Sequence, residues 1–360
     1  MADSKSELIY QDLLKRISTG DLSGKINLPT ETVLAEHYRC SRPTLRKAVD
    51  EMKQAGYITS IKGSGAYINA PRPQTSLLGI IFPNMGPGYF FDPLYNQLAQ
   101  YASCQGYSLV WGGYVSPKSD MLKFDILQLC ERYIAQGIQG LFFSPFEYHE
   151  KVEMLNEEIL NIISDAGIPI VLIDANIKPY PAPNDFDLVS LDHIHASYMM
   201  TTYLIQQTYR RIFFFAPRNS HTTIKLRLMG YHEAMLDHHL PPEPLIEIDR
   251  DDASVSCFIT EKRPDAILCS NDITAMGLIN SIEKLGMKVP ADIAVTGFDH
   301  LSQAMPFSRL ITSIEQPIEA ITQTALELMV RRITAPQKPP SCITYPGKLV
   351  IEESTASAAP

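Results

Sequence analysis

Three basic side chains open one short segment of the chain, CSRPTLRKAVDEMKQAG, which spans residues 40–56. They are Arg42, Arg46 and Lys47, and in a helix they stand at and just after its N-terminus. The apolar residues recur at spacings of three and four and form a separate core stripe: Leu45, Ala48, Val49 and Met52. A helix N-terminus favours anions, so cations gathered there suit a negatively charged partner. Guanidinium forks match guanine edges and phosphate oxygens, so the segment indicates contact with a DNA groove.

A second set of polar side chains stands where apolar strand-like runs end. Asp174 ends IVLID, Asn271 and Asp272 follow AILCS, and Asp299 follows AVTGF. The carboxyl ends of parallel strands bind ligands in open sheets, and carboxylates and amides accept hydrogen bonds from vicinal hydroxyls. Each residue taken alone could instead cap the following helix, because Asp and Asn are preferred caps. Their joint occurrence favours a ligand site.

Patterns typical of metal and cofactor chemistry are missing from the sequence. No phosphate-binding glycine loop follows a strand, and the six cysteines are scattered without a C-x-x-C pair. The pairs His193-x-His195 and His238-His239 lack further ligands at suitable spacing. We therefore expect no cofactor, no metal and no catalytic residues.

Composition places the chain among globular proteins with more than one domain. It has 360 residues, 45% apolar and 20% charged, with a formal net charge of −9. Residues 1–72 hold 11 Lys and Arg against 8 Asp and Glu, whereas the rest holds 20 against 32. A basic end on an acidic body favours a local anionic partner. No apolar run approaches the roughly 18 residues of a membrane helix, and no signal-peptide core opens the chain, so we expect a cytoplasmic location without membrane contact.

The first 70 residues contain the elements that would position the basic side chains. The pattern predicts a helix over 6–19, a short helix capped by Thr30, and the helix capped by Ser41. After residue 56 the apolar period changes to two, and Lys62 and Gly63 stand at the tip of a predicted hairpin. Helix, turn, helix and hairpin in this order make a winged helix-turn-helix.

The segment LPTETVLAEHYRCSRPTLRKAVDEMKQAGYITSIKGSGAYI resembles the GntR-type winged helix. In that family the corresponding positions contact DNA. The resemblance thus implies a DNA-binding set: Thr32, Ser41, Arg42, Thr44, Arg46, Lys47, Lys62 and Gly63. Thr32 departs from the family, which often has Arg at this position.

Beyond a linker rich in proline at 71–76, strand-like runs alternate with amphipathic helices as far as residue 345. The strand candidates are 77–82, 107–112, 138–144, 168–174, 187–192, 211–216, 264–270, 292–298 and 310–315. Such alternation predicts parallel sheets covered by helices on both faces. Nine strands fit two doubly wound lobes better than one sheet.

The segment PDAILCSNDITAMGLINSIEKLGMKVPADIAVTGFDHLSQA resembles the LacI/GalR effector domain, which is built like a periplasmic sugar-binding protein. The resemblance implies polar ligand contacts at Asp174, Arg227, Asn271, Asp299 and Gln316, with Phe90 or Phe91 stacking on a sugar ring. His300 departs from the family, which commonly has a second Asp there.

A GntR-type domain joined to a LacI/GalR-type effector domain resembles the domain arrangement of AraR-type repressors. They imply an α/β chain: a winged helix-turn-helix at 1–70, the linker at 71–76, a two-lobed sensing and dimerisation domain at 77–345 and a tail at 346–360. The expected function is a repressor that binds a pseudo-palindromic DNA operator as a homodimer and is released by a monosaccharide such as arabinose.

Two alternatives stay open at this stage. One keeps the DNA role but replaces the sugar with a nucleobase, a sugar phosphate or a corepressor. The other is a sugar-metabolising enzyme that uses two of Asp174, Asp272 and Asp299 as acid and base.

Overall fold

The structure is a computed structural model. It describes residues 5–18, 28–54, 57–61, 65–68, 76–83, 90–113, 122–147, 152–218, 220, 222–247, 252–301 and 309–355. The chain divides into two compact units, Met1–Thr75 and Ser76–Pro360. Lys62, Gly63 and linker residues 71–75 lie outside the described residues.

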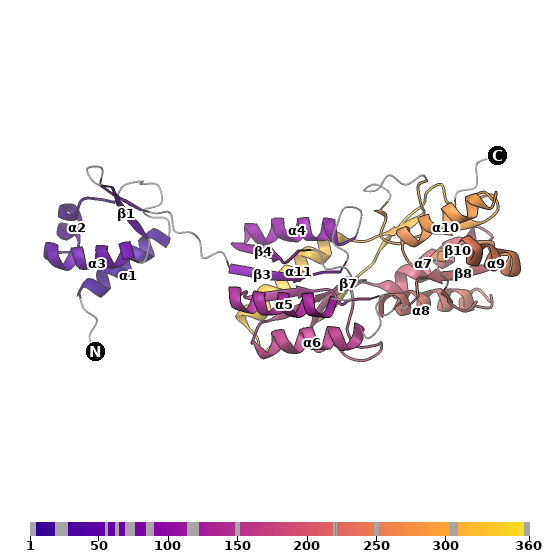
Figure 1. The fold of residues 1–360 in the computed structure, drawn as a ribbon, viewed down its shortest axis with the longest axis horizontal. Helices are drawn as coiled ribbons and strands as arrows, with labels where there is room; N and C mark the ends of the chain where they lie inside the picture. The colour runs from indigo at the N-terminus through magenta and orange to yellow at the C-terminus, as the bar shows by residue number, and fades with distance from the viewer. Residues whose placement is uncertain are drawn as a thin grey trace. The chain divides into compact units, whose positions relative to one another are not determined.

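The first unit is a small helical domain with a β-hairpin (Figure 1). It contains α1 (Lys5–Ser18), α2 (Glu31–His37), α3 (Arg42–Gln54), β1 (Ile58–Ile61) and β2 (Gly65–Ile68). The two strands pair antiparallel, and the helices bury Leu13, Leu45 and Met52 completely. The predicted caps are confirmed, because Thr30 Oγ1 accepts from Val33 N at 3.5 Å and Ser41 Oγ accepts from Thr44 N at 3.4 Å.

A six-stranded parallel sheet forms the first lobe of the second unit. Its order is β13-β7-β6-β5-β3-β4, and every neighbouring pair is parallel. The strands are β3 (Ser76–Ile81), β4 (Tyr107–Trp111), β5 (Gly140–Phe143), β6 (Ile170–Ile173), β7 (Asp187–Leu191) and β13 (Cys342–Tyr345). The central strands β5, β6 and β7 are buried throughout, as expected for a sheet covered on both faces.

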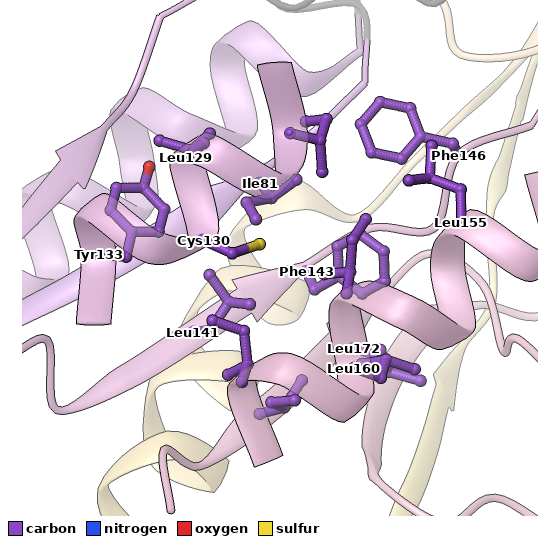
Figure 2. Packing of buried hydrophobic residues seen from close by; sticks show 14 of the residues in the cluster. Ile81, Leu129, Cys130, Tyr133, Leu141, Phe143, Phe146, Leu155, Leu160 and Leu172 are labelled. Carbon is purple, nitrogen blue, oxygen red and sulfur yellow. The ribbon is translucent and has the colours of Figure 1, made fainter. Parts of the chain in front are cut away.

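Helices cover both faces of this sheet and close two apolar clusters. The helices are α4 (Phe91–Cys104), α5 (Leu122–Gln136), α6 (Val152–Asp165) and α11 (Ile318–Thr334). Side chains of α4 and α11 fill one cluster, and side chains of α5 and α6 fill the other. Figure 2 shows the second cluster, in which Tyr133 and Phe143 lie fully buried. The Tyr133 hydroxyl accepts from Gly112 N at 2.9 Å and lies 2.8 Å from the carbonyl oxygen of Ile80.

The second lobe is built around a four-stranded parallel sheet of order β11-β10-β8-β9. Its strands are β8 (Ile212–Ala216), β9 (Ile246–Glu247), β10 (Ala266–Cys269) and β11 (Ala294–Thr296). Its helices are α7 (His193–Gln206), α8 (Thr222–Asp237), α9 (Asp252–Lys262) and α10 (Asp272–Lys284). Apolar clusters again lie on both faces, one with side chains of α7 and α8 and the other with side chains of α9 and α10.

The chain passes between the lobes after β7, after β12 (Ser313–Glu315) and after β13. The last passage leads to β14 (Lys348–Val350), which pairs antiparallel with β12. The segment expected as a C-terminal tail thus contributes a strand, and Ser354 and Thr355 are buried in this lobe. The expected fold class, a helix-turn-helix followed by two lobes of parallel sheet, is confirmed.

None of the described helices combines the length and the apolar character that crossing a membrane requires. Among the residues that the structure describes, no cluster of three or more His, Cys, Asp or Glu side chains has the arrangement to hold a metal ion.

Candidate DNA interface and candidate effector pocket

The start of α3 presents the predicted basic side chains to solvent. Arg42, Arg46 and Lys47 are exposed, as expected for side chains that lie off the buried apolar face of α3. Arg42 Nη2 donates to Thr32 Oγ1 at 3.0 Å. Thr32, which stands where the GntR pattern often has Arg, therefore orients an arginine on the neighbouring helix.

Arg46 makes a forked ion pair with Glu31 at the start of α2. The Arg46 Nη2 to Glu31 Oε2 distance is 2.8 Å, and Arg46 Nε donates to Oε1 at 3.4 Å. This hydrogen-bonded partner raises the pKa of the Arg46 guanidinium. Because both side chains are exposed, the pair stays open to an incoming phosphate or base.

A concavity of about 590 Å³ lies beside these residues. Four members of the predicted DNA set line it: Thr32, Ser41, Arg42 and Thr44. Lys5 also lines it, and its Nζ donates to the carbonyl oxygen of Arg39 at 2.7 Å. The sequence reasoning missed Lys5, since one lysine at the start of a helix carries no distinguishing signal.

In the second unit, five polar side chains from both lobes gather where the strands end. Asp174 follows β6 and His193 begins α7, whereas Arg227, Asp299 and Gln316 come from α8, the β11 end and the β12 end. Gln316 Nε2 donates to Asp299 Oδ1 at 2.7 Å, and Arg227 Nη2 lies 3.8 Å from the same oxygen. The structure thus brings together four of the predicted ligand residues: Asp174, Arg227, Asp299 and Gln316.

Arg227 is the centre of this cluster and is only 4% exposed. Its Nη1 donates to the Ser270 carbonyl oxygen, and its Nε donates to His193 Nδ1 at 3.3 Å. Its guanidinium carbon lies 3.8 Å from the centre of the Phe298 ring. The Ser270 carbonyl after β10, His193 of α7 and the Phe298 ring therefore fix the position of the buried guanidinium.

Unusual backbone conformations orient the carboxylates of Asp174 and Asp299. Asp174 has φ of 75° and Asp299 has φ of 93°, in the left-handed region that Asp tolerates better than most residues. Burial opposes ionisation of Asp174, but His193 and Arg227 outweigh it, so its pKa is lowered. Burial dominates at Asp299 and raises its pKa, although Arg227 acts in the opposite direction.

Other predicted ligand residues serve local structure. Asn271 Oδ1 accepts from Thr274 N at 2.8 Å and caps α10, which is the alternative role considered from the sequence. Phe90 and Phe91 are each 8% exposed and belong to the core cluster of the first lobe, where Phe91 packs on Phe82 at 5.2 Å between ring centres. Their contact with a ligand stays a prediction.

Glu147 is a pocket residue that the sequence reasoning missed. It comes from the first lobe, four residues beyond β5, and its carboxylate accepts from Thr223 N at 2.8 Å and from Thr223 Oγ1 at 2.8 and 3.0 Å. It therefore caps α8 of the other lobe. Burial and the charge of Asp174 raise the pKa of the Glu147 carboxyl. The only sequence signal is an acid shortly after a buried strand.

A cavity of about 310 Å³ opens between the lobes beside Glu147, near the lower end of small-molecule pockets at roughly 300–1,000 Å³. The clustered side chains of Asp174, His193, Arg227, Asp299 and Gln316 do not line it. Glu147 lines it, together with side chains that follow β5 and β6 in one lobe and side chains of α8 in the other. It is a space between lobes with a carboxylate in its wall.

Comparisons with known proteins assign a family to a segment of each of the two units. Residues 5–68 match the gntR family of bacterial regulatory proteins, and residues 201–355 match the periplasmic binding protein-like domain. The chain joins a GntR-type DNA-binding domain to a periplasmic-binding-protein-like domain.

Relatives of the same build support this assignment. The chain is 25% identical over 340 residues to an arabinose metabolism transcriptional repressor of Geobacillus stearothermophilus, with 90% of each chain covered. It is 31% identical over 189 residues to the HTH-type transcriptional repressor PurR of Aliivibrio fischeri, covering 50% of this chain and 55% of that one. Both relatives are transcriptional repressors.

A solved structure agrees on the fold. The transcriptional regulator CelR in complex with cellobiose has a TM-score of 0.65 and 20% sequence identity, covering 91% of this chain and 100% of that chain. The combination of a GntR-type domain with a periplasmic-binding-protein-like domain was predicted from sequence and is confirmed.

Proposed function

We propose that this chain is a transcriptional repressor that binds operator DNA through α3 and is released by a small sugar bound between the lobes of its second unit. The observation that carries the proposal is the presence, on one chain, of exposed arginines at a helix start and a buried Arg227–Asp299–Gln316 cluster between two lobes. The names of the arabinose repressor and the cellobiose-bound regulator support a sugar, with arabinose as one candidate.

The repressor acts as a homodimer in the cytoplasm. One winged helix reads few base pairs, too few to select a site in a genome. A two-fold dimer doubles the contact and recognises a pseudo-palindrome with half-sites about one helical turn apart or a multiple of it.

Arginine substitutions test the DNA role. Operator fragments are first selected from genomic DNA with the full-length protein. Changing Arg42 or Arg46 to Ala should weaken binding to the selected fragment by roughly tenfold or more, because a bidentate arginine contact contributes about 1–3 kcal/mol. The matched control is Lys53→Ala at the other end of α3, where Lys53 pairs with Asp50. Unchanged operator binding by both arginine variants would show that α3 does not read the DNA.

A further inference from the structure

The charges at the lobe junction are unbalanced toward carboxylates. Glu147, Asp174 and Asp299 act on one another there, because the charge of Asp174 raises the pKa of both other carboxyls. Among the described residues, Arg227 acts on all three carboxyls, and His193 acts on Asp174 and Asp299. His193 is 2% exposed, its Nδ1 lies 3.3 Å from Arg227 Nε, and its Nε2 lies 3.1 Å from the Asp174 carbonyl oxygen and 3.3 Å from Asp174 Oδ1.

Arg227 has little capacity left for a ligand. Two of its nitrogens donate to Ser270 and His193, and the third faces Asp299. Its face is stacked on Phe298. An incoming phosphate or carboxylate would have to displace these partners before it could receive the guanidinium fork.

Buried acceptor oxygens stand at this junction. Among the described residues, Gln316 Oε1 is buried without a hydrogen-bond partner, and Asp174 Oδ1 lies 3.3 Å from His193 Nε2. The assignment of Gln316 follows from its neighbour, since its amide nitrogen must face the Asp299 carboxylate. A buried acceptor without a partner is costly, so a ligand that fits here supplies donors.

Glu147 adds a further negative charge in the wall of the inter-lobe cavity. Its carboxylate bridges to α8, so a ligand that enters between the lobes meets it directly. Lys225 and Glu153 also line the cavity, and both are exposed to solvent, where their charges are screened.

We propose that the effector is an uncharged polyol that donates several hydroxyl hydrogen bonds, and that Glu147 is a specificity-determining residue that excludes its phosphorylated and carboxylated relatives. This inference rests on the proposed sugar-sensing function and decides between the neutral sugar and the sugar phosphate left open by the sequence.

The test compares neutral and anionic partners of the same sugar on the full-length protein. Calorimetric titrations use D-ribose with D-ribose 5-phosphate, L-arabinose with L-arabinonate, and D-glucose with D-glucose 6-phosphate. For any pair that binds, the neutral member should bind at least about tenfold more tightly, because like charges in a desolvated site are strongly unfavourable. A wild-type protein that binds an anion as tightly as its neutral partner would overturn the inference and leave sugar sensing intact.

Substitution of Glu147 identifies the residue responsible. Glu147→Gln keeps the shape and one acceptor for Thr223 N but removes the charge, so the neutral-to-anion affinity ratio should fall by about tenfold. The matched control, Glu153→Gln, removes a charge from an exposed position of the same cavity and should leave the ratio within about twofold. An unchanged ratio in Glu147→Gln, in a variant with wild-type circular dichroism, would overturn the role of Glu147.

Sugar sensing and the exclusion of anions would be contradicted by different results. If neither member of any pair binds the wild-type protein, sugar sensing itself is wrong, and the inference about charge falls with it. If neutral sugars bind and the anions bind equally well, only the inference about charge is wrong.

Discussion

At the scale of single residues, Asp272 is a buried acid that holds the loop of Asp299 in place. It is fully buried at the start of α10, its Oδ2 accepts from Leu301 N at 2.6 Å, and Ser313 Oγ donates to its Oδ1 at 2.7 Å. Leu301 follows closely on Asp299, so these bonds fix the loop that carries the pocket carboxylate. Burial, followed by the charge of Asp299, raises the pKa of Asp272 to about 8.

This raised pKa makes stability depend on pH. The pKa in an unfolded chain is about 3.9, so the folded state holds an extra proton between about pH 4 and pH 8. The free energy of unfolding should therefore fall as pH rises through that window, by at most about 1.4 kcal/mol per pH unit. Asp272→Asn imitates the neutral acid, with its oxygen facing Leu301 N and its amide facing Ser313 Oγ, and should lack this decline.

Urea unfolding of both proteins at pH 5 and pH 8 measures the effect. The stability of the wild type relative to Asp272→Asn should be lower at pH 8 than at pH 5. Equal differences at the two pH values would mean that Asp272 is already ionised in the fold.

Residue types and strand ends predict only part of the pocket. Asp174 and Asp299 could be predicted to stand in this cluster because each acid follows a buried strand closely. Glu147 and His193 matter through partners on the other lobe, and one sequence holds no pattern for contacts between lobes. Asn271 shows a different limit, since the same amide suits a helix cap and a hydroxyl ligand, and the local cap is observed.

At the scale of elements, the contact of α7 with α8 depends on Gly230. A Cβ atom at this position would overlap the carbonyl oxygen of Ile194 and lie 2.9 Å from Tyr198 N. Both are backbone atoms, so a change of side-chain rotamer cannot relieve the overlap. The two helices carry His193 and Arg227, so their close packing also sets the distance between these pocket residues.

Gly230→Ala should therefore destabilise the second unit. Alanine gains about 1 kcal/mol of helix propensity over glycine, but overpacking costs about 1–3 kcal/mol and more against backbone. We expect a net loss of about 1 kcal/mol or more in urea unfolding followed by circular dichroism. Met229→Ala, at a 41% exposed neighbour on the same helix, serves as the control and should change stability by less than about 0.5 kcal/mol. A Gly230→Ala variant as stable as this control would contradict the packing argument.

The elements themselves were largely predictable, since local signals determine them. Thr30 and Ser41 start helices because their side chains accept from the first turn, and the apolar runs over 168–174 and 264–270 became the buried strands β6 and β10. The path of the chain near its C-terminus was not predictable. The segment KLV at 348–350 reads as a tail but completes a strand pair with β12, a partner more than 30 residues away.

At the scale of the whole molecule, release of DNA by a sugar requires that the two units communicate. A sugar can loosen DNA binding only if it binds the DNA-free form more tightly than the DNA-bound form. Within the second unit, Glu147–Thr223 and Asp174–His193 join the two lobes at the pocket, so a ligand that replaces or strengthens these contacts changes lobe closure. In a dimer, closure would alter the spacing of the two DNA-binding units.

Linkage supplies the most direct test of this central claim. The neutral sugar that binds in the paired titrations is titrated calorimetrically into the full-length protein, once alone and once with saturating operator DNA. We expect operator DNA to weaken sugar affinity by the same factor by which sugar weakens operator affinity, about 5–150-fold. Equal sugar affinities with and without operator would contradict it, because the sensor would then not control the DNA-binding domain.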